Sequence, residues 1–88
     1  MTELINTIQI YKHEEGAIIT AIIDSIHRWD FDELHTLLAF NYQVSGMTLF
    51  YHGPVFCVNY DINNHDFVQE IETKLTEGKY PFLSLIQK

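Results

Sequence analysis

The side chains that could carry out chemistry are few, and the histidines are the first to consider. The five histidines are His13, His27, His35, His52 and His65. None of them has the HxxxH or HExxH spacing of a zinc site, and the lone Cys57 has no second cysteine to join it. Asp24 with His27, and Asp61 with His65, are close enough in sequence to bind a metal weakly, but solvated surface groups explain both pairs more simply. The sequence therefore predicts no metal site.

The other reactive side chains also lack the context that catalysis needs. Carboxylates act as general acids and bases only in a desolvated cleft, and nothing in the sequence indicates one. Cys57 has no adjacent cation or helix start that would lower the pKa of its thiol, so we interpret it as a structural residue. The serines lack a nucleophile elbow, and the isolated glycines form no phosphate-binding loop. We expect a protein that is not an enzyme, with no catalytic residues and no cofactor.

Acidic residues dominate the charge, with twelve Asp and Glu against five Lys and Arg, and the formal net charge is −7. The cations are scattered and form no patch. This disfavours direct binding to nucleic acid, because phosphate neutralisation needs clustered cations. An acidic surface keeps a protein soluble, and it also attracts basic partners.

The most apolar and aromatic stretch, residues 47–60, predicts a β-hairpin that turns at His52-Gly53-Pro54. Alternate residues of a strand point to opposite faces, yet both faces of both arms carry large apolar groups. A hairpin with one wet face should instead alternate between apolar and polar residues. Both faces of this hairpin must therefore be covered, either by the rest of the chain or by another molecule.

The residues that we expect to meet a partner combine the aromatic groups of the hairpin with nearby acids. Aromatic rings commonly anchor a protein interface, while charged groups form its rim. The expected partner-binding residues are Phe50, Tyr51, His52, Phe56, Tyr60, Asp30, Asp32 and Glu33.

The length of 88 residues predicts one domain that spans residues 1–88. A chain of this size buries about 60–65% of its unfolded surface, which allows a single core. The single cysteine excludes an internal disulfide, the N-terminus lacks a signal-peptide pattern, and the apolar run 17–23 is too short to cross a membrane. These features favour a cytoplasmic protein that does not interact with membranes.

Hydrophobic periodicity predicts the elements that position these residues. The expected elements, in order, are a strand over 4–11, helices over 16/17–29 and 31–40, the hairpin over 47–60, a helix over 65–77 and a strand over 82–86. The first helix is predicted from an isoleucine-rich arc of about 140° that runs from Ile18 to Trp29. Asp30 with Glu33 resembles a capping box at the start of the second helix.

This order is that of the split βαβ pattern of ferredoxin-like domains, with a helical insertion after the first helix. Right-handed crossovers would put the amphipathic helices on one face of a small antiparallel sheet, so the predicted fold class is α+β. The alternative is a winged-helix-like fold, in which the two early helices form a helix-turn-helix and the hairpin is the wing. In the ferredoxin-like arrangement, the second face of the sheet is either open or covered by the 31–40 helix.

Small size, negative charge and surplus aromatic residues together indicate a non-enzymatic protein–protein interaction module. We expect an acidic inhibitor or immunity-type protein that binds a basic, nucleic-acid-handling protein without touching nucleic acid itself. The alternative is a homodimeric regulatory domain, in which two sheets pack through their open faces and a small ligand binds at the junction.

Overall fold

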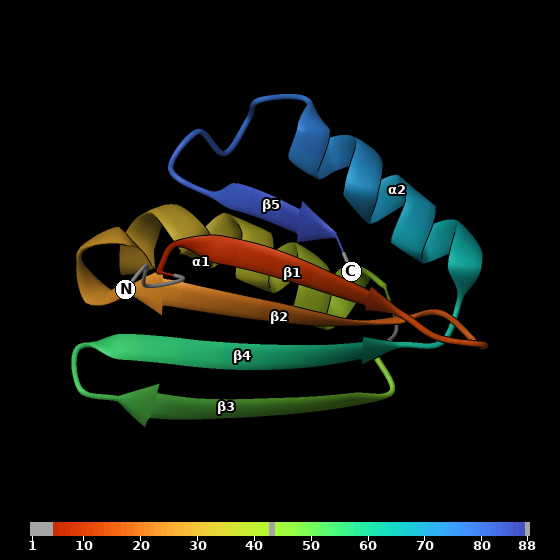
Figure 1. Ribbon diagram of the computed structural model, residues 1–88, viewed down its shortest axis with the longest axis horizontal. Coiled ribbons are helices and arrows are strands. Elements are labelled where there is room, and N and C mark those ends of the chain that lie inside the picture. The colour runs from red at the N-terminus through yellow and green to blue at the C-terminus, as the bar shows by residue number, and fades with distance from the viewer. Residues whose placement is uncertain (1–4, 43, 88) are drawn as a thin grey trace.

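A mixed β-sheet with helices on one face makes up the computed structural model, which describes residues 5–42 and 44–87 (Figure 1). The strands are β1 (Thr7–Lys12), β2 (Ala17–Asp24), β3 (Gly46–His52), β4 (Val55–Ile62) and β5 (Ser84–Gln87). The helical elements are the 3₁₀ turn η1 (Ser25–His27), α1 (Arg28–Thr36), the π-helical turn η2 (Leu37–Asn41) and α2 (His65–Thr76). The strand order is β3–β4–β2–β1–β5, and neighbours are antiparallel except β5, which runs parallel to β1. The predicted α+β class is confirmed.

The segment expected as the first helix is largely a strand. β2 pairs with β1 on one side and with β4 on the other. Its side chains alternate between the two faces, and the residues that point into the core are Ala17, Ile19, Ala21 and Ile23. Isoleucine suits a strand because its branched Cβ packs well on a pleated surface, and pairing on both sides favours the strand over the helix. The predicted helix that ends at Trp29 is wrong for this reason.

The sheet order does not fit either predicted topology. A ferredoxin-like domain places one helix after a single strand and the other after a hairpin, whereas here a hairpin precedes each helix. The sheet also has five strands, and β5 is parallel to its neighbour. The split βαβ prediction fails because it takes β2 for a helix. The winged-helix alternative fails in the same way, since it needs a helix where β2 lies.

The other predicted elements are present, with small shifts at their ends. β3 and β4 form the predicted hairpin, and Gly53 in its turn has a φ of 64° that favours glycine. α2 begins where the Asn64 side chain accepts hydrogen bonds from the backbone N–H groups of Asp66 and Phe67. α1 begins at Arg28, so the predicted capping box is wrong and Asp30 lies inside the first turn.

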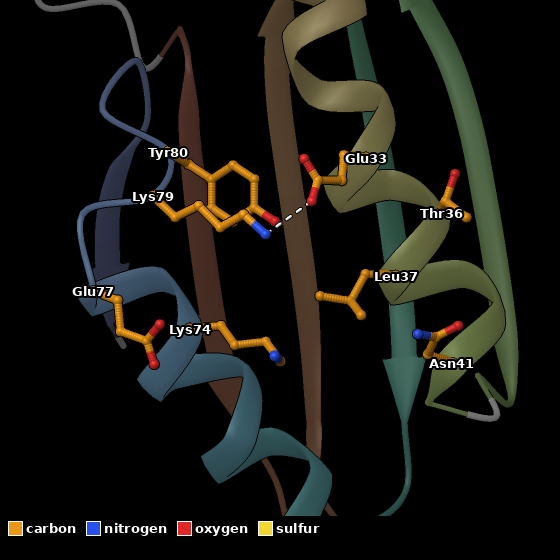
Figure 2. A pocket seen from close by; sticks show the side chains of 8 residues that line it. All are labelled: Glu33, Thr36, Leu37, Asn41, Lys74, Glu77, Lys79 and Tyr80. Atoms are coloured by element: carbon orange, nitrogen blue, oxygen red, sulfur yellow. Dashed lines mark hydrogen bonds and ion pairs between the residues drawn. The ribbon is translucent and has the colours of Figure 1, made fainter.

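The core lies between the sheet and the two α-helices. α1 contributes Phe31 and Leu34 to it, and α2 contributes Val68 and Ile71. Figure 2, which looks onto the helix side, shows both helices in front of the strands. Among the described residues, the buried apolar layer therefore lies on this side of the sheet.

The second face of the sheet carries no helix in the part of the chain that the structure describes. α1 does not cover it, since Phe31 of α1 stacks at 5.7 Å between ring centroids on Phe56, which points to the helix side. Of the two alternatives for this face, the open one is therefore the observed one.

Candidate functional site

Strand β3 forms one edge of the sheet, and all seven of its residues are exposed. β4 pairs with its inner side from Gly46 to His52, while no strand among the described residues pairs with its outer side. The strand sequence, GMTLFYH, contains no Asp, Glu, Lys or Arg. Unpaired backbone N–H and C=O groups beside apolar side chains are a ready template for another chain. We call the outer side of β3 the docking edge.

The helix-facing side chains of β3 border a groove against α1. The register with β4 puts Met47, Leu49 and Tyr51 on the same face as the buried residues of that strand. They remain exposed because no strand in the described ranges lies beyond them, and Tyr51 is 59% exposed. The groove has a volume of about 210 Å³ and is lined by Arg28, Phe31, Asp32, His35, Leu49, Tyr51 and Phe56. It brings together Tyr51, Asp32 and Phe56, three of the predicted partner-binding residues.

Two further predicted residues, Phe50 and His52, lie on the opposite side of β3. Phe50 is 49% exposed and stands opposite Cys57 in the register with β4. Both residues line a hollow of about 530 Å³ on the open face, whose walls are Ile5, Ile22, Phe50, His52, Pro54, Val55 and Cys57. A partner that contacts Tyr51 and Phe50 together must straddle the docking edge.

The last two predicted aromatic residues, Phe56 and Tyr60, lie in the core. The Phe56 ring packs between those of Phe31 and Tyr51, at 5.7 and 6.2 Å between centroids. The Tyr60 hydroxyl oxygen lies 2.6 Å from Nδ1 of His35, and burial raises the pKa of Tyr60 above its ordinary value. Both rings lie beneath the docking edge. Phe56 is 6% exposed and lines the groove, whereas Tyr60 is fully buried and cannot contact a partner directly.

The three predicted acids all lie on α1 but do not share one site. Asp32 alone lines the groove beside Tyr51. Asp30 Oδ2 lies 3.1 Å from Nδ1 of His27, and Glu33 Oε1 accepts a 2.8 Å hydrogen bond from Nζ of Lys79. Asp30 and Glu33 are both exposed, and together they line a hollow on the side of the helix away from the groove.

A cleft lies between α1 with η2 and the segment that follows α2 (Figure 2). It has a volume of about 420 Å³ and is lined by Glu33, Thr36, Leu37, Asn41, Lys74, Glu77, Lys79 and Tyr80. The ion pair of Glu33 and Lys79 joins its two walls, as the dashed line in Figure 2 shows. The π-helical turn forms part of one wall, and such turns often occur at functional sites. The cleft offers both signs of charge to a small polar ligand.

The histidines, the Asp–His pairs and Cys57 are the side chains that the sequence offers for chemistry. Among the described residues, no group of three or more His, Cys, Asp and Glu side chains could hold a metal ion. The two pairs expected from the sequence, Asp24 with His27 and Asp61 with His65, are replaced by others. His27 Nδ1 lies 3.1 Å from Oδ2 of Asp30, and Asp61 Oδ1 lies 3.3 Å from Nε2 of His13. Burial raises the pKa of the Cys57 thiol, which disfavours the reactive thiolate.

Some exposed apolar residues escape prediction from the sequence. The helical arc puts Ile26 and Trp29 in the core, yet Trp29 is 82% exposed. The signal that indicates this is Asp24, whose side chain accepts a hydrogen bond from the Ile26 N–H and begins a new element there. Met47 and Leu49 lie in the predicted hairpin, but only the position of β3 at the sheet edge shows that they are exposed.

Comparisons with known proteins give no family, since the chain matches no protein-family model, no curated protein and no solved structure. Within residues 5–42 and 44–87, no helix is long and apolar enough to cross a membrane.

Proposed function

We propose that the chain is a non-enzymatic protein–protein interaction module that binds its partner at the docking edge. The observation that supports this proposal is that all seven residues of β3, an edge strand without Asp, Glu, Lys or Arg and with large apolar side chains, are exposed. Monomeric proteins usually protect such an edge with charges, a proline or a bulge. β3 has none of these, and its pairing with β4 runs without interruption. A strand of this kind is expected where a partner covers it.

Both sides of the docking edge offer aromatic anchors. Tyr51 borders the groove against α1, and Phe50 borders the hollow on the open face. Aromatic side chains at the centre of an interface commonly carry much of the binding energy, and truncation of one to alanine costs about 2 kcal/mol or more. Tyrosine also keeps its hydroxyl in water while its ring is buried. We therefore assign Tyr51 and Phe50 as the two anchors.

The partner that we propose is a basic protein that handles nucleic acid. The chain carries a net charge of −7, and Asp32 lines the groove next to Tyr51 together with one cation, Arg28. Opposite charges on two proteins speed their association and exclude wrong partners. A small acidic module that covers the working surface of such a protein acts as a stoichiometric inhibitor or immunity protein. In this role it does not contact nucleic acid itself.

Site-specific photo-crosslinking tests this function. p-Benzoylphenylalanine at position 51 reports on the docking edge, and the same residue at position 40 is the control, because Phe40 is exposed but lies on η2. In an extract of the native cells, we expect position 51 and not position 40 to crosslink one defined basic protein. The purified partner should bind Tyr51→Ala at least tenfold more weakly than the original chain. The absence of a heterologous product, or the same products from both positions, would contradict the proposal.

A regulatory domain that binds a small ligand is the second candidate, and the cleft favours it. Its volume of about 420 Å³ is in the usual range for small-ligand sites. Lys74 lines the cleft, and among the described residues no acid forms an ion pair with it, so its ammonium group is free to bind an anionic group. A thermal-shift screen of small carboxylic and amino acids tests this candidate. Support requires a stabilising ligand whose effect is lost in Lys74→Ala and kept in Arg28→Ala; a screen with no such ligand counts against it.

A further inference from the structure

We propose that a second copy of this chain occupies the docking edge when no other partner is bound, with two β3 strands paired antiparallel about a two-fold axis at Leu49. The inference rests on the proposed function in one respect, since it takes the outer side of β3 as a docking edge. It adds the identity of the occupant in the free protein and the way in which the edge is regulated.

The two edges of the sheet differ in a way that selects β3 for this contact. β5, at the other edge, has four residues, whereas β3 has seven and pairs with β4 along its whole length. Pairing β3 with β3 of another copy uses the same surface on both chains. Such an isologous contact closes into a dimer and leaves no further long edge for a filament.

The sequence of β3 is complementary to itself in this register. With Leu49 opposite Leu49 of the second copy, Met47 lies opposite Tyr51 and Thr48 lies opposite Phe50. Cβ atoms of residues directly opposite in an antiparallel pair are about 4.5–5.5 Å apart, so these side chains would be in contact. Aromatic and aliphatic residues then face each other on the helix side. Every exposed apolar residue of β3 gains an apolar or threonine neighbour.

The charge distribution permits this self-association despite the overall acidity. A net charge of −7 repels a second copy in general, but no acid or base lies within β3 itself. At each end of the paired strands, Gly46 would lie opposite His52 of the second copy. Asp61 stands beside Gly46 in the register with β4, where its Oδ1 lies 3.3 Å from Nε2 of His13, and a Cβ at Gly46 would meet no atom within 4 Å.

Self-pairing also gives the helix side of the edge a cover. A two-fold axis perpendicular to the sheet keeps the helices of both copies on the same face, and the two grooves then face each other. Met47 of one copy would lie beside Tyr51 of the other, between the two α1 helices. The basic partner would have to displace the second copy to reach the same edge. The dimer would therefore keep the docking edge covered until that partner binds.

A charge-swap experiment at the axis tests the proposal. Leu49 is 45% exposed, so replacement by a charged residue costs little core packing. Sedimentation equilibrium should show a dimer of the original chain at micromolar concentration. Leu49→Lys alone and Leu49→Glu alone should each weaken the dimer at least tenfold, because like charges would meet across the axis. A one-to-one mixture of the two variants should restore it as a heterodimer.

Ile18→Lys is the matched control, since Ile18 is 41% exposed on the open face of β2, away from the edge. It should leave the dimer intact, whereas a dimer formed through the open faces of two sheets would be lost. Circular dichroism of each variant shows that it has folded. A chain that is monomeric throughout the concentration range overturns the proposal. So does a dimer that Ile18→Lys disrupts, or a charge swap that restores nothing.

The two proposals can fail separately. A strictly monomeric chain that still crosslinks a basic protein from position 51 would contradict the proposed dimer and support the proposed interaction module. A β3 dimer that crosslinks only to itself would contradict the proposed basic partner and support the proposed dimer.

Discussion

Nδ1 of His35 on α1 lies 2.6 Å from the hydroxyl oxygen of Tyr60 on β4, and this hydrogen bond joins the helix layer to the sheet one strand inside the docking edge. The two rings are also in contact, with centroids 5.8 Å apart. His35 at the same time lines the groove beside Tyr51. The contact therefore sets the distance between α1 and the edge strand, and with it the width of the groove.

Removing either partner of this hydrogen bond should destabilise the fold unequally. His35→Ala leaves the fully buried Tyr60 hydroxyl without its partner, which costs about 1–3 kcal/mol in the free energy of unfolding. Tyr60→Phe leaves only the half-buried imidazole of His35, which water can reach, so we expect a loss of about 0.5–1.5 kcal/mol. Urea denaturation of both variants and of the double variant measures the difference and the coupling. Equal losses with no coupling would contradict the role assigned to this hydrogen bond.

Glycine is required at position 16, where the β1–β2 turn meets the end of β4. A Cβ built there lies 1.9 Å from the carbonyl oxygen of Ile62 and 2.8 Å from the backbone nitrogen of Asn64. Neither backbone atom can move away cheaply, so Gly16→Ala should lower the free energy of unfolding by about 2 kcal/mol or more. Gly46→Ala is the control, because its Cβ meets no atom within 4 Å and should change stability by less than about 0.5 kcal/mol. Thermal unfolding of both variants tests this, and similar melting temperatures would refute the close approach.

The contrast between α2 and β2 shows how much of the fold the sequence predicts. α2 carries its own signals, an asparagine cap at Asn64 and one apolar stripe, and a local reading finds it correctly. In β2, isoleucines at positions 18, 19, 22 and 23 fit the helical period, and as a strand they place apolar side chains on both faces instead of alternating with polar ones. Pairing with β1 and β4 decides between them, and the pairing with β4 joins residues far apart in the sequence. The parallel pairing of β5 with β1 likewise depends on tertiary structure, and no local sequence pattern predicts it.

The sequence predicts the candidate site in part: it shows which side chains of the hairpin share a face. Alternation correctly groups Phe56 with Tyr60 and separates Phe50 from Tyr51. It cannot say which strand of the hairpin lies at the edge. Because β4 pairs on both sides and β3 on one, Phe56 and Tyr60 are buried whereas Phe50 and Tyr51 remain exposed.

Stability should fall in alkaline solution because buried tyrosines resist ionisation. Burial, with the charge of Glu70 and a hydrogen bond to it adding to the effect, raises the pKa of Tyr42 from 10.0 to about 12. Above pH 10 the unfolded chain releases this proton while the folded chain keeps it, so the stabilisation present below pH 10 is lost progressively up to about pH 12. One such proton contributes a slope of about 1.4 kcal/mol per pH unit.

Tyr42→Phe tests this linkage. The variant loses its hydrogen bond to Glu70 at every pH, which shifts the whole curve of stability against pH downward. Between pH 10 and 12 its curve should also be shallower than that of the original chain, because one titrating group is gone. Urea denaturation at pH 8, 10 and 11 separates the constant offset from the slope. Parallel curves would show that Tyr42 does not titrate differently in the folded state.

Cys57 should react slowly with thiol reagents while the protein is folded. Burial raises the pKa of its thiol, and the thiolate is the species that attacks an alkylating reagent. The side chain is half-buried on the open face, opposite Phe50, which also limits access. At pH 8 we expect alkylation by iodoacetamide to be about tenfold slower than in urea-unfolded chain, and Phe50→Ala to recover part of the difference by opening the hollow. A folded chain that reacts as fast as the unfolded one would show that Cys57 is accessible, and the open face would then have to be considered as a site of thiol chemistry.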